Sequence, residues 1–283
     1  MARRPVSIPR GVSAWVLGTV SALSLWFVAY AVFLTPMQTA HEQAGLYSSL
    51  RAQLAAQTAP LGGSIAPGSP VALLTVPAIG LTNAVVIEGT AAGDLEAGVG
   101  HRRDTPLPGQ SGDSVLYGRA TLFGGPFGAL ARIKVGDTIT ATTGQGVFSY
   151  TVSGLRQGGD NLPPALALGG GRLTLVTGSH LGFAGLSARG LLYIDAALKG
   201  TGLATLPGRP AAVPLSEQAL QVDPNGLLPL ALALPLLIAI AALVVWAWFR
   251  WGRWQTWLLG LPLVLAGLWL ASESAIRLLP NLL

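Results

Sequence analysis

The hydrophobic positions of the chain follow two patterns: long apolar stretches near the two ends and short alternating runs between them. Three of these long apolar stretches contain no Asp, Glu, Lys or Arg, namely 11–41, 224–249 and 254–272. Each is about long enough for a helix to cross ~30 Å of hydrocarbon. We therefore expect three transmembrane helices, at 12–34, 227–249 and 254–271.

The region 71–199 has the period of β-strands. Short runs rich in β-branched residues are separated by Gly, Pro and Asp, and one segment, 126–137, has the pattern of a short helix. "TGQG" at 143–146 predicts a two-residue hairpin turn. The pattern predicts a mainly β domain, a closed or nearly closed barrel of seven to eight strands with one or two short helices. The strands are expected at 71–80, 83–89, 113–119, 137–143, 146–156, 172–178 and 189–198.

The segments around this domain are expected to be connectors. Residues 35–70 combine a stalk helix, with Leu46, Leu50 and Leu54 on one face, and a Gly/Pro linker. A second linker is expected over 200–226. The remaining segments are a basic N-terminus at 1–11, a tight turn at 250–253 and a C-terminal segment at 272–283.

Arginines at the edges of the apolar stretches predict the topology. Arg3, Arg4 and Arg10 precede the first stretch, and Arg250 and Arg253 occupy the turn between the other two. Cytoplasmic segments are enriched in Lys and Arg, so both clusters belong in the cytoplasm. The expected protein is an uncleaved, three-span protein of the plasma membrane, with a cytoplasmic N-terminus and an extracytoplasmic β domain.

Charge and cysteine content exclude several classes of function. The net charge is +5, but residues 41–225 hold 11 basic and 11 acidic side chains, so the excess lies in the membrane flanks. That distribution argues against nucleic-acid binding. The chain has no cysteine and only three histidines, so no disulfide, metal or cofactor is expected. An extracytoplasmic domain without cysteine is typical of Gram-positive cell surfaces.

The strand "RLTLVTGSH" at 172–180 ends in small polar residues, where a reactive side chain is often presented. Ser179 is a candidate nucleophile, with His101 or His180 as its base. Adjacent residues on a strand point to opposite faces, which argues against the pair Ser179 and His180.

Three motifs in this order resemble the sortase family, over about 71–198. "LTVPAIGLTNAVVIEGTAAGDLEAGVGHRRDTPLPGQSGDSVLYGRATLFGGPFGALARIKVGDTI" is similar to the first half of a sortase domain. "GVFSYTVSGLR" and "LTLVTGSH" are similar to the later hairpin strand and to the strand that ends in the nucleophile. The short segment 157–171 is closest to classes D and E. The resemblance implies a membrane-anchored barrel that transfers sorting-signal peptides through a cysteine thioester.

The same resemblance implies three catalytic positions, and at each of them this chain has a different residue type from the family's cysteine, histidine and arginine. The cysteine falls on Gly178, which has no side chain to acylate, and the histidine falls on Arg119, whose guanidinium stays protonated. The arginine falls on Leu191, with Arg189 two residues earlier as a loose substitute. Arg119, Thr177, Gly178 and Arg189 would line the peptide groove.

The arginines and the last two spans leave alternatives open. Arg119 and Arg189 either bind a carboxylate or an anionic wall polymer, or are solvated or paired with Asp104, Asp113 or Asp195. In the third span, Gly260, Gly267 and Ala271 have the spacing for close approach of a partner helix. Glu273 and Arg277, four apart, predict an i, i+4 ion pair.

Three functions remain open. The favoured hypothesis is a sortase-like pseudoenzyme that binds a surface protein, a sorting-signal peptide or an active sortase during cell-surface and cell-wall assembly. The second is a transpeptidase or hydrolase that uses Ser179 with His101 or His180. The third is a purely structural subunit of a membrane complex.

Overall fold

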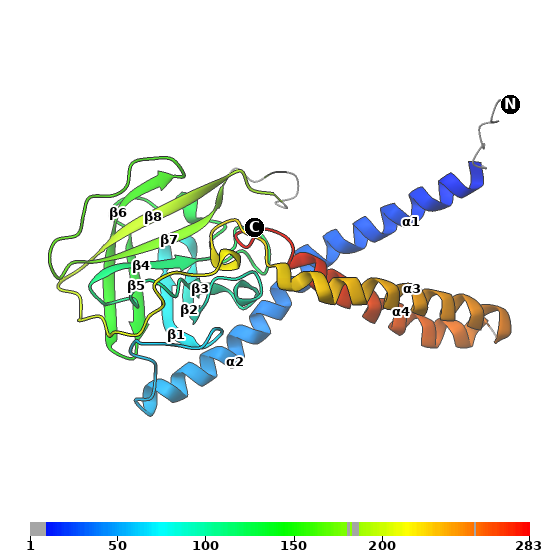
Figure 1. The fold of residues 1–283 in the computed structure, drawn as a ribbon, viewed down its shortest axis with the longest axis horizontal. Helices are drawn as coiled ribbons and strands as arrows, with labels where there is room; N and C mark the ends of the chain where they lie inside the picture. Colours follow the sequence, from blue (N-terminus) through cyan, green and yellow to red (C-terminus); the bar gives the residue numbers. More distant parts are fainter. Residues whose placement is uncertain (1–9, 180–181, 183–186, 252) are drawn as a thin grey trace.

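Eight strands form a closed barrel in the computed structural model, which describes residues 10–179, 182, 187–251 and 253–283 (Figure 1). The barrel confirms the predicted fold class. Seven strands lie where the alternation predicts them, and the eighth, β3, is too short to show a period. The strands are β1 (Pro70–Val76), β2 (Leu81–Glu88), β3 (Val99–His101), β4 (Gly112–Tyr117), β5 (Thr138–Thr143), β6 (Gly146–Gln157), β7 (Gly171–Ser179) and β8 (Gly190–Leu198).

The strand order around the barrel is β1-β2-β3-β4-β7-β8-β6-β5, and β5 pairs with β1 to close it. Two neighbouring pairs, β2–β3 and β4–β7, are parallel, and the others are antiparallel. Thr143 pairs with Gly146 across the predicted two-residue hairpin turn. The parallel pairing of β4 with β7 brings the ends of these two strands, Tyr117 and Ser179, to the same rim.

The expected short helix at 126–137 is wrong, because this segment is a series of turns with one 3-10 turn at Leu130–Arg132. Gly125 has φ +50°, outside the helical range. A Cβ at Gly128 would lie 2.4 Å from the Ala120 carbonyl oxygen, so the chain passes too close to Ala120 for a regular helix with side chains.

The predicted stalk helix packs along the barrel. Helix α1 (Arg10–Ala29), a π-helical turn (Tyr30–Leu34) and α2 (Thr35–Ala55) form one continuous rod. The predicted leucine face of α2 covers β2, with Leu50 fully buried against Val85 and Ile87. The Gln43 side chain accepts from Val85 N at 2.8 Å and donates to Val85 O at 3.1 Å, as a neighbouring strand would.

The last two helices, α3 (Leu227–Arg250) and α4 (Arg253–Ile276), form a hairpin. Helix α4 continues five residues past the predicted end of the third span, at residue 271. Three helices in the described part of the chain are long and apolar enough to cross a membrane. They leave the barrel on the same side, with α1 diverging from the hairpin (Figure 1).

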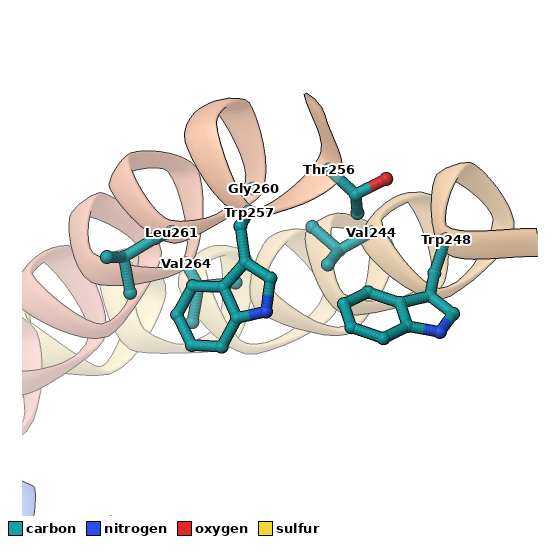
Figure 2. Close-up of a pocket in the computed structure, with 7 residues that line it drawn as sticks. All are labelled: Val244, Trp248, Thr256, Trp257, Gly260, Leu261 and Val264. Carbon is teal, nitrogen blue, oxygen red and sulfur yellow. The ribbon is translucent and has the colours of Figure 1, made fainter. Parts of the chain in front are cut away.

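Small residues of α4 hold the hairpin together. A Cβ at Gly260 would lie 3.1 Å from Val244 Cγ1, and one at Gly267 would lie 3.0 Å from Leu237 Cδ1. Both glycines therefore face α3, whereas their spacing predicted that they would face a helix of a partner protein. A hollow of about 260 Å³ lies beside Gly260, and its lining residues include Trp248 of α3 and Trp257 of α4. Figure 2 shows these lining residues.

The segment 200–226, expected to be a free linker, is packed onto the barrel. Leu203 O accepts from Ser111 N at 2.8 Å, and Arg209 Nη1 donates to Glu88 Oε1 at 2.8 Å. Arg103 forms a two-bond ion pair with Glu217, in which Arg103 Nε lies 2.9 Å from Glu217 Oε2. These contacts tie the start of the membrane hairpin to the barrel.

Candidate functional site

The end of β7 carries Gly178 in register with Leu191 of β8, so the sheet brings two of the three implied catalytic positions together. Gly178 is buried. A Cβ built on it would lie 2.8 Å from the Leu282 carbonyl oxygen and 3.1 Å from Ala188 Cβ. The space that a nucleophile side chain would need is therefore occupied by another part of the chain.

That part is the segment 279–283, which follows α4 and is called the strap below. Leu282 O accepts from Ala120 N at 3.2 Å, and Leu283 O accepts from Leu122 N at 3.3 Å. Both leucine side chains are fully buried. In Figure 1 the C-terminal end lies where the barrel meets the long helices.

Arg119, at the implied histidine position, is fully buried and is neither solvated nor paired with Asp104, Asp113 or Asp195. Arg119 Nη2 donates to Ala92 O at 2.7 Å, and Nε donates to Leu95 O at 3.3 Å. The guanidinium lies 4.7 Å from the centre of the Phe123 ring. Burial lowers the pKa of Arg119 to about 10, and the nearby Glu96 carboxylate opposes that shift. At neutral pH the side chain is still a cation, so it cannot accept a proton as a base does.

The 3-10 turn Asp94–Glu96 holds both this arginine and the membrane hairpin. Glu96 receives two bonds from Arg277, at 2.8 Å from Nε and 3.0 Å from Nη2, and Arg277 also bonds Glu273 at 3.1 Å as predicted. Burial raises the pKa of Glu96, while the bonds from Arg277 oppose the rise. Burial also raises the pKa of Asp94 to about 6, because the bond from Ala91 N only partly offsets desolvation.

His101, the candidate base, is committed to other partners. Its Nδ1 lies 3.0 Å from Glu88 Oε2 and its Nε2 lies 2.9 Å from Pro106 O, with the ring fully buried. Glu88 also binds Arg209 of the segment 200–226, so Glu88 connects His101 and Arg209 in one buried cluster of polar side chains.

The register separates His101 from Ser179. His101 pairs with Leu116, which pairs with Leu175, so His101 and Ser179 lie two strands apart and four residues apart along β7. With a rise of ~3.3 Å per residue and ~4.8 Å between strands, this places the two backbones about 16 Å apart. His180, the other candidate base, lies outside the described residues.

The remaining candidate residues have local partners or face solvent. Thr177 is buried and its Oγ1 donates to Gly118 O at 2.9 Å, so it joins β7 to the end of β4. Arg189 is exposed, and its backbone N donates to Ser179 O at 3.2 Å. Leu191 packs with Leu282 of the strap.

Sequence reasoning missed the strap and Glu96. The available signal was "LLPNLL" after Arg277, six residues without a charge beyond the predicted end of the last span. Such a segment is expected to be covered by protein or lipid. The pattern does not say which, and the partner on the barrel is about 160 residues earlier in the chain.

Comparisons with known proteins identify the domain that contains this site. The family model of the sortase domain matches residues 74–180. Sortase D of Bacillus subtilis (strain 168) is 34% identical over 86 residues, which are 30% of this chain and 41% of the relative. The match thus spans less than half of that relative's length.

Solved sortase structures are also similar to part of this chain. The Clostridium perfringens Sortase D5 transpeptidase is 20% identical, with a TM-score of 0.44, and covers 56% of this chain and 99% of its own. Sortase E from Streptomyces avermitilis is 26% identical, with a TM-score of 0.40, over 48% of this chain and 92% of its own.

Proposed function

We propose that this chain, which carries a sortase domain and so belongs to the sortase family, is a membrane-anchored, non-catalytic subunit of cell-surface protein assembly. The proposal is supported mainly by which residues stand at the catalytic positions that the family resemblance implies. Gly178 stands at the nucleophile position with its Cβ space filled by Leu282, and Arg119 is a buried cation. Without a thiolate and a base, the thioester route has no nucleophile and no proton acceptor.

The alternative is an enzyme that uses Ser179 with His101 or His180. The geometry favours the non-catalytic role over the first of these pairs, because both ring nitrogens of His101 face other oxygens and Ser179 lies about 16 Å away by strand spacing. A nucleophile and its base must lie within about 3 Å for proton transfer.

The proposed placement puts the barrel outside the plasma membrane and the N-terminus in the cytoplasm. Support comes from the three candidate spans and from the arginines in both expected cytoplasmic segments. These arginines are Arg3, Arg4 and Arg10 before the first span, and Arg250 and Arg253 between the last two. The proposed partners are a surface protein with its sorting signal or an active sortase in the same membrane.

Catalysis is tested with the full chain in detergent, a sorting-signal peptide and an amine acceptor. We expect no cleaved or ligated product by mass spectrometry, while a cysteine-bearing sortase gives product under the same conditions. Product that disappears in Ser179→Ala would refute the non-catalytic role and establish the alternative.

A second candidate, a purely structural subunit, is favoured by the strap, because a filled site leaves little room for a peptide. In cells, partner recovery after crosslinking separates the two roles. Arg189→Ala changes the exposed cation beside the site, and Gly267→Leu disrupts the packing of α4 on α3. Loss of the partner only in Gly267→Leu supports the structural subunit, and loss only in Arg189→Ala supports binding through the sortase domain.

A further inference from the structure

We infer that the strap is an intramolecular ligand of the degenerate site formed by Arg119, Gly178 and Leu191. It closes this site to peptides from other proteins and fixes the membrane hairpin to the barrel. The inference deepens the proposed non-catalytic function, on which it rests, by naming what occupies the site. Four sets of contacts carry it.

The first two sets are the burial of two leucines in separate pockets. Leu282 packs among Leu95, Tyr117, Val176 and Leu191 on the barrel. Full burial of a leucine side chain contributes about 1.5–3 kcal/mol relative to exposure, so this side chain is a genuine anchor.

The second pocket joins the barrel to the membrane helices. Leu283 packs with Leu122 and Phe123 of the barrel, with Tyr30 of the π-helical turn and with Ile276 of α4. One side chain therefore connects the first span, the last span and the loop that follows Arg119.

The third set is polar and fixes the direction of the strap. Asn281 N donates to Gln221 O at 3.0 Å, and Asn281 Nδ2 donates to Thr90 O at 2.8 Å and to Gln218 O at 2.9 Å. The Asn281 side chain is fully buried, so these bonds replace the contacts of its amide nitrogen with water. An apolar residue at 281 would leave both carbonyls without this donor.

The fourth set is the ion pair at the entrance of the strap. Arg277, immediately after α4, binds both oxygens of Glu96, and the turn that carries Glu96 also supplies Leu95 O to Arg119. The same turn thus holds the end of the hairpin and the buried arginine.

The glycine at 178 is the residue that makes room for the strap. Any side chain there begins with a Cβ 2.8 Å from the Leu282 carbonyl oxygen, closer than such atoms approach in folded proteins. A cysteine at this position would therefore force the backbone of the strap at Leu282 to shift, so the glycine and the seated strap fit each other.

The experiment uses the absence of native cysteine in the full chain, so that a single introduced thiol is the only one labelled. Ala188→Cys places the thiol beside Gly178, in contact with the cluster that contains Leu283. Val147→Cys, on β6, is 69% exposed and serves as the matched control. Labelling by a charged maleimide is measured with the native strap and with Leu282→Asp/Leu283→Asp.

We expect the thiol at 188 to react at least tenfold faster when the two leucines are aspartates, and the thiol at 147 to react equally in both backgrounds. A peptide Leu-Leu-Pro-Asn-Leu-Leu added in trans should slow the faster reaction, and Leu-Leu-Pro-Asn-Asp-Asp should not. Equal labelling at 188 with and without the aspartates overturns the inference.

Hydrogen exchange on the unsubstituted chain gives a second readout that does not require the aspartate variant to fold. The amides of Ala120 and Leu122, which donate to the strap, should be protected, and exchange at the rate of exposed loops overturns the inference. Neither readout involves turnover. A ligation product dependent on Ser179 therefore refutes the non-catalytic function alone, while equal labelling refutes the strap alone.

Discussion

Replacing Arg277 by alanine tests how strongly the end of α4 is held to the barrel. The Arg277 side chain is 34% exposed and its partner Glu96 is 12% exposed. Exposed ion pairs contribute about 0–1 kcal/mol, and breaking a buried pair costs about 3–5 kcal/mol. For this half-buried, two-bond pair we expect Arg277→Ala to lower the free energy of unfolding by about 2 kcal/mol at neutral pH.

The loss should depend on pH with a defined sign. Burial already raises the pKa of Glu96, and removing Arg277 removes the bonds that oppose this rise. A carboxyl whose pKa is raised in the folded state stabilises the protein below the pKa of the unfolded state and loses that contribution as pH increases through the folded value. The difference between Arg277→Ala and the native chain should therefore be largest above neutral pH and shrink towards pH 4.

The assay is thermal or denaturant unfolding in detergent between pH 4 and pH 8, for Arg277→Ala, Glu96→Gln and the double variant. A coupling energy of about 1–2 kcal/mol between the two positions at neutral pH is expected for residues in direct contact. Additive effects of the two substitutions, or a difference that does not change with pH, would contradict the reasoning.

Three further substitutions test other contacts, each by unfolding measurements on the full chain. Leu50→Ala should lower the free energy of unfolding by about 2–5 kcal/mol, because it opens a cavity between α2 and β2. The neighbouring, exposed Arg51→Ala should lower it by less than about 0.5 kcal/mol. Equal effects of the two substitutions would mean that α2 is a free stalk. Asp94→Asn should stabilise the protein above pH 6 and have little effect near pH 4, because the pKa of Asp94 is raised to about 6 and the native carboxylate is the less stable form at higher pH; a stabilisation that persists at pH 4 would contradict this. Glu88→Ala should cost about 3–5 kcal/mol, because it leaves Arg209 without its buried carboxylate; an effect below about 1 kcal/mol would show that the cluster is solvated.

Much of the architecture can be predicted from the local periodicity of apolar and polar residues, which the sequence shows directly. The three uncharged stretches and the alternation that predicts β7 depend only on neighbouring residues, because span length and strand faces follow from helix and strand geometry. The resemblance of the motif order to that of sortases also predicts that Gly178 and Arg119 stand at the positions of the cysteine and the histidine. The sequence alone therefore determined the fold class and the expected spans, and it predicted which catalytic positions carry other residues.

The tertiary structure decided what fills that position and what the arginine contacts. Leu282 and Ala120 are far apart in the chain, and only closure of the barrel and return of the hairpin bring them within 3.2 Å. The sequence leaves open whether Arg119 binds an anionic ligand, meets water or pairs with an aspartate, whereas in the structure it is buried against the carbonyl groups of Ala92 and Leu95 and the Phe123 ring. Such contacts produce no periodic pattern of residues in the sequence. They arise from long-range packing, where a short apolar segment such as 279–283 is stable only against a surface that distant residues build.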